Sequence, residues 1–398
     1  MPARGRTCRC RVEQWRGGGI LLAGIWSAMK ILHVITGLKV GGAEMMLQRL
    51  IQAASDHCHV VVCLTAEDVV GADLIRRGVA VKALNIGGLW SLVTGCARLS
   101  RLMTVERPDI VHCWMYHSNL IGGIVARASG VTKVVWGVRA TDLPRTGSIK
   151  TRLVRSICAL LSAAVPSRVI YAADVSRRMH EALGYSTRKS LVIPNGFDID
   201  SLKAAWRGRA SMRARLGILE GEQVIGCVGR FHDDKGPDVF LKAASLVRGV
   251  DRRVRFMMVG REMVETNSIL MNWIADLGLT GSVLLLGEQP DVPAYLAAMD
   301  VFCLPSRTEG FPNVVGEAMG AGLCCVVTDV GDAAHLLGGT GYVVPPDNPS
   351  ALSAGLLSFV NMSAAERMAI GRSAQDRIEG QFSLKAVAAA YSDFYQSL

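Results

Sequence analysis

The chain has 398 residues, of which half are hydrophobic and a fifth are charged, so it is long enough for two packed domains and too apolar for a disordered polar chain. Its 44 lysines and arginines outnumber its 34 aspartates and glutamates, and the resulting net charge of +10 favours anionic partners. Charge alone does not distinguish nucleic acid, acidic lipid headgroups and phosphorylated substrates, so the function has to be inferred from the pattern along the chain.

The first 28 residues differ from the rest of the chain. Five arginines precede an apolar run at 20–26, a pattern similar to a signal peptide with a short apolar region. The stretch MKILHVIT, which begins at Met29, is typical of a first β-strand with its own initiator, so we interpret residues 1–28 as an extension rather than an export signal. The eleven cysteines form no CxxC pair, which gives no support to a zinc site and indicates reduced thiols in a cytoplasmic protein.

From Lys30 onward, short apolar runs alternate with amphipathic helical patterns. The first half contains seven predicted strands, at 30–36, 59–65, 79–86, 109–114, 133–138, 168–172 and 191–194. After the turn sequence PNGFD, five more follow at 223–229, 255–260, 282–287, 300–306 and 323–329. This alternation predicts an α/β protein with two doubly wound parallel sheets, joined near residues 196–220. Ligand-binding loops of such sheets lie at the carboxyl ends of the strands.

The loop GLKVGGAE at 37–44 follows the first predicted strand and opens the first helix. Gly41 and Gly42 would let the backbone approach a ligand closely, with the following amides facing it. An ordinary tight strand-to-helix turn has the same composition, and the loop matches neither GxGxxG nor a P-loop.

The stretch GRFHDDKGPD at 229–238 repeats this theme in the second half. Arg230 offers a planar fork for phosphate oxygens and Lys235 a point charge, so the pair is suited to a diphosphate. A solvated basic pair is the alternative that the stretch leaves open when it is taken alone.

Two glutamates, Glu309 and Glu317, lie eight residues apart in SRTEGFPNVVGEAMGAG at 306–322. Proline is favoured at the first helical position, so we predict a helix from about Pro312, with Glu309 in the preceding loop and Glu317 in the second turn. The unpaired N–H groups and the helix dipole at this end favour an anion. Carboxylates repel phosphate and suit hydroxyl groups, so a ligand with both, such as a sugar nucleotide, fits this stretch.

Four motifs therefore occur in order: GGAE at 41–44, GRFHDDKG at 229–236, SRTEGFPNVVGEAMGAG at 306–322 and VTDVGD at 327–332. Together they resemble the retaining glycosyltransferases of family 4 (GT4), and the Glu-x7-Glu spacing is the most diagnostic part. The resemblance extends from about Met29 to the end of the chain. It implies the GT-B fold, in which two Rossmann-like doubly wound domains face a central cleft.

The resemblance implies transfer of a sugar from a nucleoside diphosphate sugar, UDP- or GDP-linked, to an acceptor hydroxyl in polysaccharide, lipopolysaccharide or other glycoconjugate synthesis. The anomeric configuration would be retained through an oxocarbenium-like transition state, without a metal ion or a cofactor. Arg230 and Lys235 would stabilise the departing diphosphate, Glu309 would contact sugar hydroxyls and Glu317 would hold the ribose. The expected donor-binding residues are Gly41, Gly42, Arg230, Lys235, Arg261, Glu309, Gly310, Phe311, Pro312, Asn313 and Glu317.

The same resemblance divides the chain. We expect the extension at 1–28, an acceptor domain at 29–197, a donor domain at 198–375 and a C-terminal helix at 376–398 that returns to the first domain. The Asp-x-Asp of FDID at 197–200 falls in the linker, and we interpret it as turn chemistry rather than a metal site.

Three further residues complete the predicted site. Relatives often show His-x-His at the end of the strand DIVHCW, whereas this chain has Trp114 in place of the second histidine. We therefore keep both His112 and His117 as catalytic candidates, with a hydrogen-bonded core histidine as the alternative for either. Arg139 ends the next strand, and its guanidinium suits an acceptor phosphate or a surface ion pair.

The segment 148–163 has the pattern of a basic amphipathic helix. Its apolar positions share one face, namely Ile149, Leu153, Val154, Ile157, Leu160 and Leu161, whereas Lys150, Arg152 and Arg155 lie toward the other. Such a helix can lie on an anionic membrane that carries a lipid-linked glycan acceptor, which would make the protein cytoplasmic and peripheral on the inner face of the membrane. Packing of the apolar stripe on a sheet is the alternative.

Two other functions remain open at this stage. A nucleotide-sugar epimerase of the same architecture would need the diphosphate cradle without an acceptor, and a non-catalytic nucleotide-sugar binder would need neither transfer nor isomerisation. Nucleic acid is not an expected partner, because no basic patch interleaved with aromatic residues and no known binding motif occurs.

Overall fold

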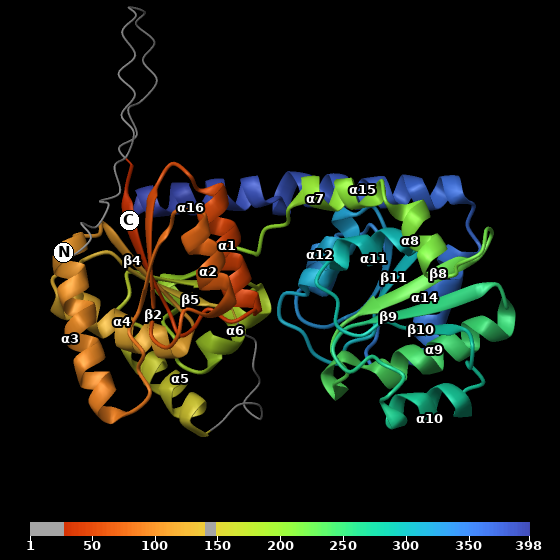
Figure 1. The fold of residues 1–398 in the computed structure, drawn as a ribbon, viewed down its shortest axis with the longest axis horizontal. Coiled ribbons are helices and arrows are strands. Elements are labelled where there is room, and N and C mark those ends of the chain that lie inside the picture. Colours follow the sequence, from red (N-terminus) through yellow and green to blue (C-terminus); the bar gives the residue numbers. More distant parts are fainter. Residues whose placement is uncertain (1–27, 140–148) are drawn as a thin grey trace, which may run out of the picture.

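The computed structural model describes residues 28–139 and 149–398. Nearly all of the N-terminal extension and the start of the amphipathic segment at Ser148 lie outside the described residues. The described chain forms two lobes, each a parallel sheet with helices on both faces (Figure 1). This arrangement confirms the predicted α/β class with two doubly wound sheets.

The first lobe is built on a seven-stranded sheet in the order β3-β2-β1-β4-β5-β6-β7, with every pair parallel. Its strands are β1 (Lys30–Ile35), β2 (Cys58–Cys63), β3 (Ala80–Ala83), β4 (Ile110–Trp114), β5 (Val134–Val138), β6 (Arg168–Tyr171) and β7 (Ser190–Val192). Its helices are α1 (Gly42–Ala53), α2 (Asp68–Arg76), α3 (Leu89–Glu106), α4 (Tyr116–Ala128), α5 (Ile149–Leu161), α6 (Asp174–Ala182), the short η1 (Thr187–Lys189) and the C-terminal α16 (Leu384–Ser397).

The second lobe is built on a six-stranded parallel sheet in the order β10-β9-β8-β11-β12-β13. Its strands are β8 (Gln223–Val228), β9 (Val254–Val259), β10 (Val283–Leu285), β11 (Val301–Leu304), β12 (Cys324–Thr328) and β13 (Tyr342–Val344). Its helices are α7 (Ile199–Trp206), α8 (Arg209–Arg215), η2 (Asp233–Lys235), α9 (Pro237–Val250), α10 (Ser268–Asp276), α11 (Val292–Ala298), α12 (Asn313–Gly320), α13 (Ala333–Leu337), α14 (Pro349–Val360) and α15 (Ala364–Phe382).

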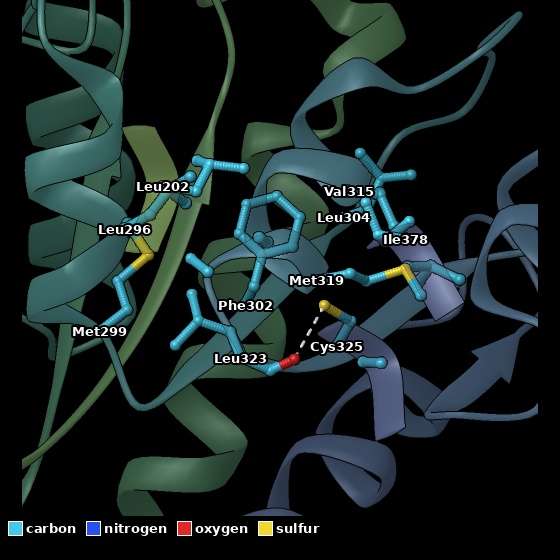
Figure 2. Packing of buried hydrophobic residues seen from close by; sticks show 14 of the residues in the cluster. Leu202, Leu296, Met299, Phe302, Leu304, Val315, Met319, Leu323, Cys325 and Ile378 are labelled. Carbon is cyan, nitrogen blue, oxygen red and sulfur yellow. Dashed lines mark hydrogen bonds between the residues drawn. The ribbon is translucent and has the colours of Figure 1, made fainter. Parts of the chain in front are cut away.

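The central strands are buried on both faces because helices cover both faces of each sheet. Figure 2 shows the core on one side of the second sheet, where Phe302 and Leu304 of β11 meet Val315 and Met319 of α12. Ile378 of α15 packs into the same cluster. These contacts seat α12 on the sheet and thereby fix the direction of its N-terminal end.

The chain crosses between the lobes twice, and the two crossings lie side by side. The Phe197 amide donates to the Phe382 carbonyl at 2.9 Å, and the Leu384 amide donates to the Phe197 carbonyl at 2.8 Å. Beyond Ser383, α16 runs over the first lobe and packs against α1 (Figure 1). Tyr391 and Tyr395 of α16 belong to the core of the first sheet.

Several local expectations differ from the structure. Strand β13 was not predicted, because three residues are too few for a readable pattern. The segment 196–220 contains α7 and α8 rather than a plain linker, and Asp198 of FDID caps α7 by accepting from the Ser201 amide at 3.1 Å. Helix α12 begins at Asn313, one residue after the predicted start, with Pro312 at its N-cap. The return to the first lobe begins at Ser383 rather than near residue 376.

Helix α5 also departs from its predicted faces. Arg155 is buried, although the pattern placed it among the solvent-facing cations. Three residues of the predicted apolar stripe are exposed instead: Ile149, Leu153 and Leu160, at 76%, 61% and 82%. The stripe therefore does not pack on the sheet as a whole. Among the described residues, no helix combines the length and the apolarity needed to cross a bilayer.

Neutral histidines form a hydrogen-bonded chain inside the first lobe. The indole N–H of Trp114 donates to Nδ1 of His33 at 3.2 Å, so the other nitrogen of His33 carries a proton and donates to Nδ1 of His59 at 3.0 Å. His59 in turn donates from Nε2 to the Ala54 carbonyl at 2.9 Å. Burial lowers the pKa of His33 well below its ordinary value of 6.5, and burial also lowers the pKa of His59 and of His112.

We expect the free energy of unfolding to fall as the pH is lowered below about 6.5. There the unfolded chain binds protons that these buried histidines exclude, and each such proton changes stability by about 1.4 kcal/mol per pH unit. Urea midpoints at pH 7.5, 6.5 and 5.5 measure the slope. His33→Gln should reduce it, whereas the exposed His335→Gln should leave it unchanged. A midpoint independent of pH over this range would contradict the prediction.

Candidate active site

The loop between β11 and α12 holds Glu309 in a fixed position. Lys235 Nζ lies 2.7 Å from Glu309 Oε1, and the Ser306 hydroxyl donates to the same oxygen at 2.7 Å. The Glu309 side chain is 9% exposed. The two sequence-predicted residues, Lys235 and Glu309, are therefore brought together, and Ser306 is a partner that the sequence did not indicate.

The short helix η2 brings Lys235 to this loop. Gly236 follows it with φ +60°, and a Cβ there would overlap the Pro305 carbonyl, so glycine is required at this close approach. The Arg307 amide donates to the Asp234 carbonyl at 2.8 Å, which joins the two loops through the backbone.

Arg307 ties the same loops through its side chain. It forms ion pairs with Asp233 at 2.9 Å, Asp238 at 2.9 Å and Asp347 at 2.6 Å. Sequence reasoning missed this residue, because its three partners are spread over more than a hundred positions. The guanidinium is paired with three protein carboxylates, so it restrains the loops and does not present a free charge to a ligand.

Arg230 and Arg261 stand at the ends of two adjacent strands, β8 and β9. Each strand ends in valine and is followed by Gly-Arg, and a Cβ on Gly260, which has φ +142°, would overlap the Gly229 carbonyl. The backbones continue together beyond the strands, because the Phe231 amide donates to the Arg261 carbonyl at 2.9 Å. Both arginine side chains are exposed. The carboxyl edge of the sheet thus presents two cations to solvent beside Lys235.

Residues 310–313 connect this edge to the first lobe. The Phe311 ring stacks on Phe197 with centroids 6.1 Å apart, and Pro312 is buried. The side-chain amide of Asn195 donates to Asn313 Oδ1 at 2.8 Å. Asn195 belongs to the turn sequence that ends the first half, and no role in the site was predicted for it.

Glu317 lies in the second turn of α12 and faces the first lobe. Burial raises its pKa, and the Arg49 guanidinium, 3.5 Å away on α1, opposes part of that rise. Gly41 and Gly42 stand at the start of the same helix α1, with Gly41 extended at φ −165° as the N-cap. A Cβ on Gly42 would meet nothing within 4 Å, whereas a Cβ on Gly41 would overlap the Glu44 carboxylate.

Arg139 is held by protein groups on part of its guanidinium, and its role toward an acceptor phosphate stays a prediction. Its guanidinium is enclosed between Trp114 and Tyr391, at 5.3 Å and 5.7 Å from their ring centroids. Nη1 donates to Asn195 Oδ1 at 2.8 Å and to the Ile193 carbonyl at 3.2 Å. Burial lowers the pKa of Arg139 to about 10. Arg139 therefore supports Asn195, which in turn contacts Asn313.

His112 is fully buried, so it presents no surface to a substrate and its candidacy as a catalytic residue is not supported by its position. Its Nδ1 lies 2.7 Å from the Tyr395 hydroxyl, and its ring stacks on Trp114 at 4.5 Å.

His117 is partly exposed in the first turn of α4. Just before that helix, Met115 adopts φ +71° and ψ 165°, a conformation that non-glycine residues rarely hold. Of the two histidines, only His117 is placed where a ligand could reach it.

Within residues 28–139 and 149–398, no group of three or more histidine, cysteine or acidic side chains is arranged to hold a metal ion. The cationic groups at the carboxyl edge of the second sheet, the Glu309 carboxylate and the N-terminus of α12 are what the described chain offers to a ligand.

Models of two protein families match the chain. "Glycosyltransferase Family 4" matches residues 40–201, and "Glycosyl transferases group 1" matches residues 222–362. The two matches divide between the lobes in the order that the motifs predicted. This chain belongs to the family 4, group 1 glycosyltransferases.

Individual relatives agree with this assignment. The enzyme is 31% identical over 235 residues to an Escherichia coli UDP-Gal:alpha-D-GlcNAc-diphosphoundecaprenol alpha-1,3-galactosyltransferase, an alignment that covers 58% of this chain and 60% of that protein. It is 29% identical over 281 residues to the lipopolysaccharide core biosynthesis mannosyltransferase LpcC of Rhizobium leguminosarum bv. viciae, covering 66% of this chain and 78% of the relative. These relatives favour glycosyl transfer over the epimerase and the non-catalytic binder.

Solved structures establish the fold as GT-B. Anabaena HepE in complex with UDP superposes with a TM-score of 0.82 at 23% identity, covering 93% of this chain and all of HepE. WaaG, a glycosyltransferase involved in lipopolysaccharide biosynthesis, superposes with a TM-score of 0.68 at 17% identity, covering 92% and 99% of the two chains.

For this glycosyltransferase we expect Lys235→Ala to raise the dissociation constant of a nucleoside diphosphate about tenfold, because a charge-assisted contact to phosphate is lost. Calorimetric titration with UDP and with GDP measures the change. Lys242→Ala is the matched control, since Lys242 pairs with Asp238 on the surface of the same lobe. Unchanged affinity in the Lys235 variant would reject the phosphate assignment.

Proposed function

We propose that this glycosyltransferase moves a sugar from a UDP-sugar to a hydroxyl of a lipid-linked glycan, with retention of the anomeric configuration and without a metal ion. The observation that carries the proposal is the hydrogen bonding of the Glu309 carboxylate. Lys235 and Ser306 both bind its Oε1, and no described residue is hydrogen-bonded to its Oε2. A carboxylate that is anchored on one oxygen and unused on the other is ready to accept a hydrogen bond from a sugar hydroxyl.

The cations beside Glu309 are suited to the leaving group. Arg230 and Arg261 are exposed just beyond the ends of β8 and β9, and Lys235 pairs with Glu309 in the loop before α12. A departing diphosphate gains negative charge, so preorganised cations and the amides at the helix N-terminus would stabilise the transition state. In this proposal they take the role that a metal ion has in other transferases.

Glu317 is proposed to hold the ribose of the donor. Glu317 is largely buried, and a buried carboxylate suits a neutral hydrogen-bonding partner such as a hydroxyl group. The nearby Arg49 guanidinium stabilises the negative charge of Glu317, so that the carboxylate can accept hydrogen bonds. Gly41 and Gly42 stand at the start of the helix that carries Arg49, and in this proposal their turn approaches the donor from the first lobe.

The choice of donor and acceptor follows the relatives. HepE was solved with UDP and with UDP-glucose, and the Escherichia coli galactosyltransferase is named for UDP-Gal and a diphosphoundecaprenol-linked acceptor. We therefore propose a UDP-linked donor rather than a GDP-linked one, and an acceptor carried on a lipid diphosphate.

One face of the first lobe is suited to an anionic membrane. Helices α3 and α5 flank α4 there (Figure 1). Among the residues of these three helices, Glu106 is the single acidic side chain, and it pairs with Lys30 at 2.9 Å. Trp90 is 86% exposed. The large exposed apolar residues of these helices are Trp90, Val93, Val105, Ile124, Ile149, Leu153 and Leu160, and the exposed cations are Arg98, Arg101, Lys150 and Arg152. We propose that this face adsorbs to the bilayer that carries the acceptor.

The experiment that tests the function is release of nucleoside diphosphate from UDP-, GDP- and ADP-sugars, with and without a membrane lipid extract. Release from one UDP-sugar that increases with lipid is the expected result. Conversion of a donor into an isomer without release would replace the proposal by the epimerase. NMR of the product's anomeric proton tests retention, and activity that persists with a chelator tests metal independence.

Glu309→Gln should lower kcat about a hundredfold and change the dissociation constant of UDP less than threefold, because the contact is to the sugar rather than to the nucleotide. Steady-state kinetics and calorimetry measure the two quantities. The exposed Glu265→Gln, on the same lobe, is the matched control. Full activity in the Glu309 variant would exclude its sugar-binding role.

A triple variant, Ile149→Ser, Leu153→Ser and Leu160→Ser, should lose most of its binding to vesicles of phosphatidylglycerol, because it removes apolar area that would enter the bilayer. Co-sedimentation measures bound protein, with phosphatidylcholine vesicles as the uncharged comparison. Leu246→Ser and Ile269→Ser remove exposed apolar side chains from the second lobe and should bind as the wild type does. Equal binding by both variants would exclude this face.

A further inference from the structure

Helix α6 of the first lobe lacks an N-cap side chain of its own. Its N-cap residue is Ala173, which has no side-chain acceptor. The carboxylate of Asp174, the first helical residue, is engaged by Arg177 at 2.7 Å and by Arg178 at 2.9 Å. The first backbone N–H groups of α6 therefore need an acceptor from elsewhere in the molecule.

Asp332 of the second lobe supplies that acceptor. Its Oδ2 accepts from the Asp174 amide at 2.7 Å, and its Oδ1 accepts from the Val175 amide at 3.0 Å. The Asp332 side chain is buried, with the residue 5% exposed. Charge-assisted hydrogen bonds and the helix dipole both stabilise a carboxylate at a helix N-terminus. The contact of Asp332 with α6 therefore stabilises the arrangement in which the two lobes lie together.

The backbone of the same residue holds the loop that carries Glu309. The Asp332 amide donates to the Gly310 carbonyl at 2.9 Å. Gly331 has φ +58°, and a Cβ there would lie against the Glu309 and Gly310 carbonyls, so the two segments touch through their main chains. Asp332 thus contacts the first lobe through its side chain and the Glu309 loop through its main chain.

We propose that Asp332 is a positioning residue that couples closure of the lobes to the geometry of the Glu309 loop. When the lobes separate, the carboxylate loses the α6 amides and the restraint on residues 331–332 is released, and with it the restraint on Gly310. Closure restores both. A ligand that needs the ordered loop therefore binds the closed arrangement better and shifts the population toward it. The link to donor binding rests on the function proposed above.

Hydrogen exchange of the free protein tests the coupling without any ligand. In Asp332→Ala, amide exchange should become about tenfold faster in the peptide that begins α6 and also in the peptide spanning residues 307–313, because a helix cap is lost. Asp329→Ala is the matched control: it removes the same charge from the same loop, where Asp329 is exposed and makes no contact with α6 among the described residues. Asp332→Asn keeps the side-chain volume and retains one acceptor, so it should give an intermediate rate.

The dissociation constant of UDP, measured by calorimetry, should rise several-fold in Asp332→Ala and stay unchanged in Asp329→Ala. Faster exchange confined to α6, with the 307–313 peptide unaffected, would overturn the coupling, and so would unchanged exchange at both places. If the wild type binds no UDP, the proposed donor is wrong, and the two exchange rates still decide the role of Asp332. Should Asp332→Ala fail to fold, Asp332→Asn carries the same comparison.

Discussion

The absence of a side chain at Gly316 is the constraint on which the arrangement of the site depends. A Cβ there would overlap the Phe197 ring, so α12 and the first chain crossing can lie in contact only with glycine at this position. Phe197 is also the residue whose backbone pairs with the second crossing. One close contact therefore fixes α12, which carries Glu317 and follows the Glu309 loop, against the segment that joins the lobes.

The charges of the site fall into two groups with different roles. Arg307 and Arg139 are engaged by protein groups, the first by three aspartates and the second by Asn195 and two aromatic rings. Arg230 and Arg261 remain exposed at the ends of neighbouring strands. Held cations keep loops rigid, whereas exposed ones keep their charge for a ligand, and a sequence does not tell the two apart.

The sequence predicted the repeated βα pattern, the two sheets and a shared location for Lys235 and Glu309 at the carboxyl ends of the strands, because each depends on residues that are near in sequence or on strand ends that share an edge. It left the burial of His112 as an alternative to a catalytic role, because the choice depends on Tyr395 of a helix 283 positions away. The contacts of Arg139 with Tyr391 and Asn195 were not predicted for the same reason. Strand β13 was missed because its three residues are too few for a readable pattern. Contacts across the lobe interface, such as Asn195 with Asn313, leave no local pattern to read.

The pairing of the two chain crossings has a mechanical consequence. Because Phe197 is hydrogen-bonded to both Phe382 and Leu384, the two connections form one short ribbon rather than two separate tethers. A single ribbon resists sliding of one lobe past the other. Rotation of the lobes about the axis of the ribbon is therefore the motion that costs the least energy. Each lobe would then swing as a rigid body about a fixed axis, so that groups far from the ribbon travel furthest and groups beside it stay in register.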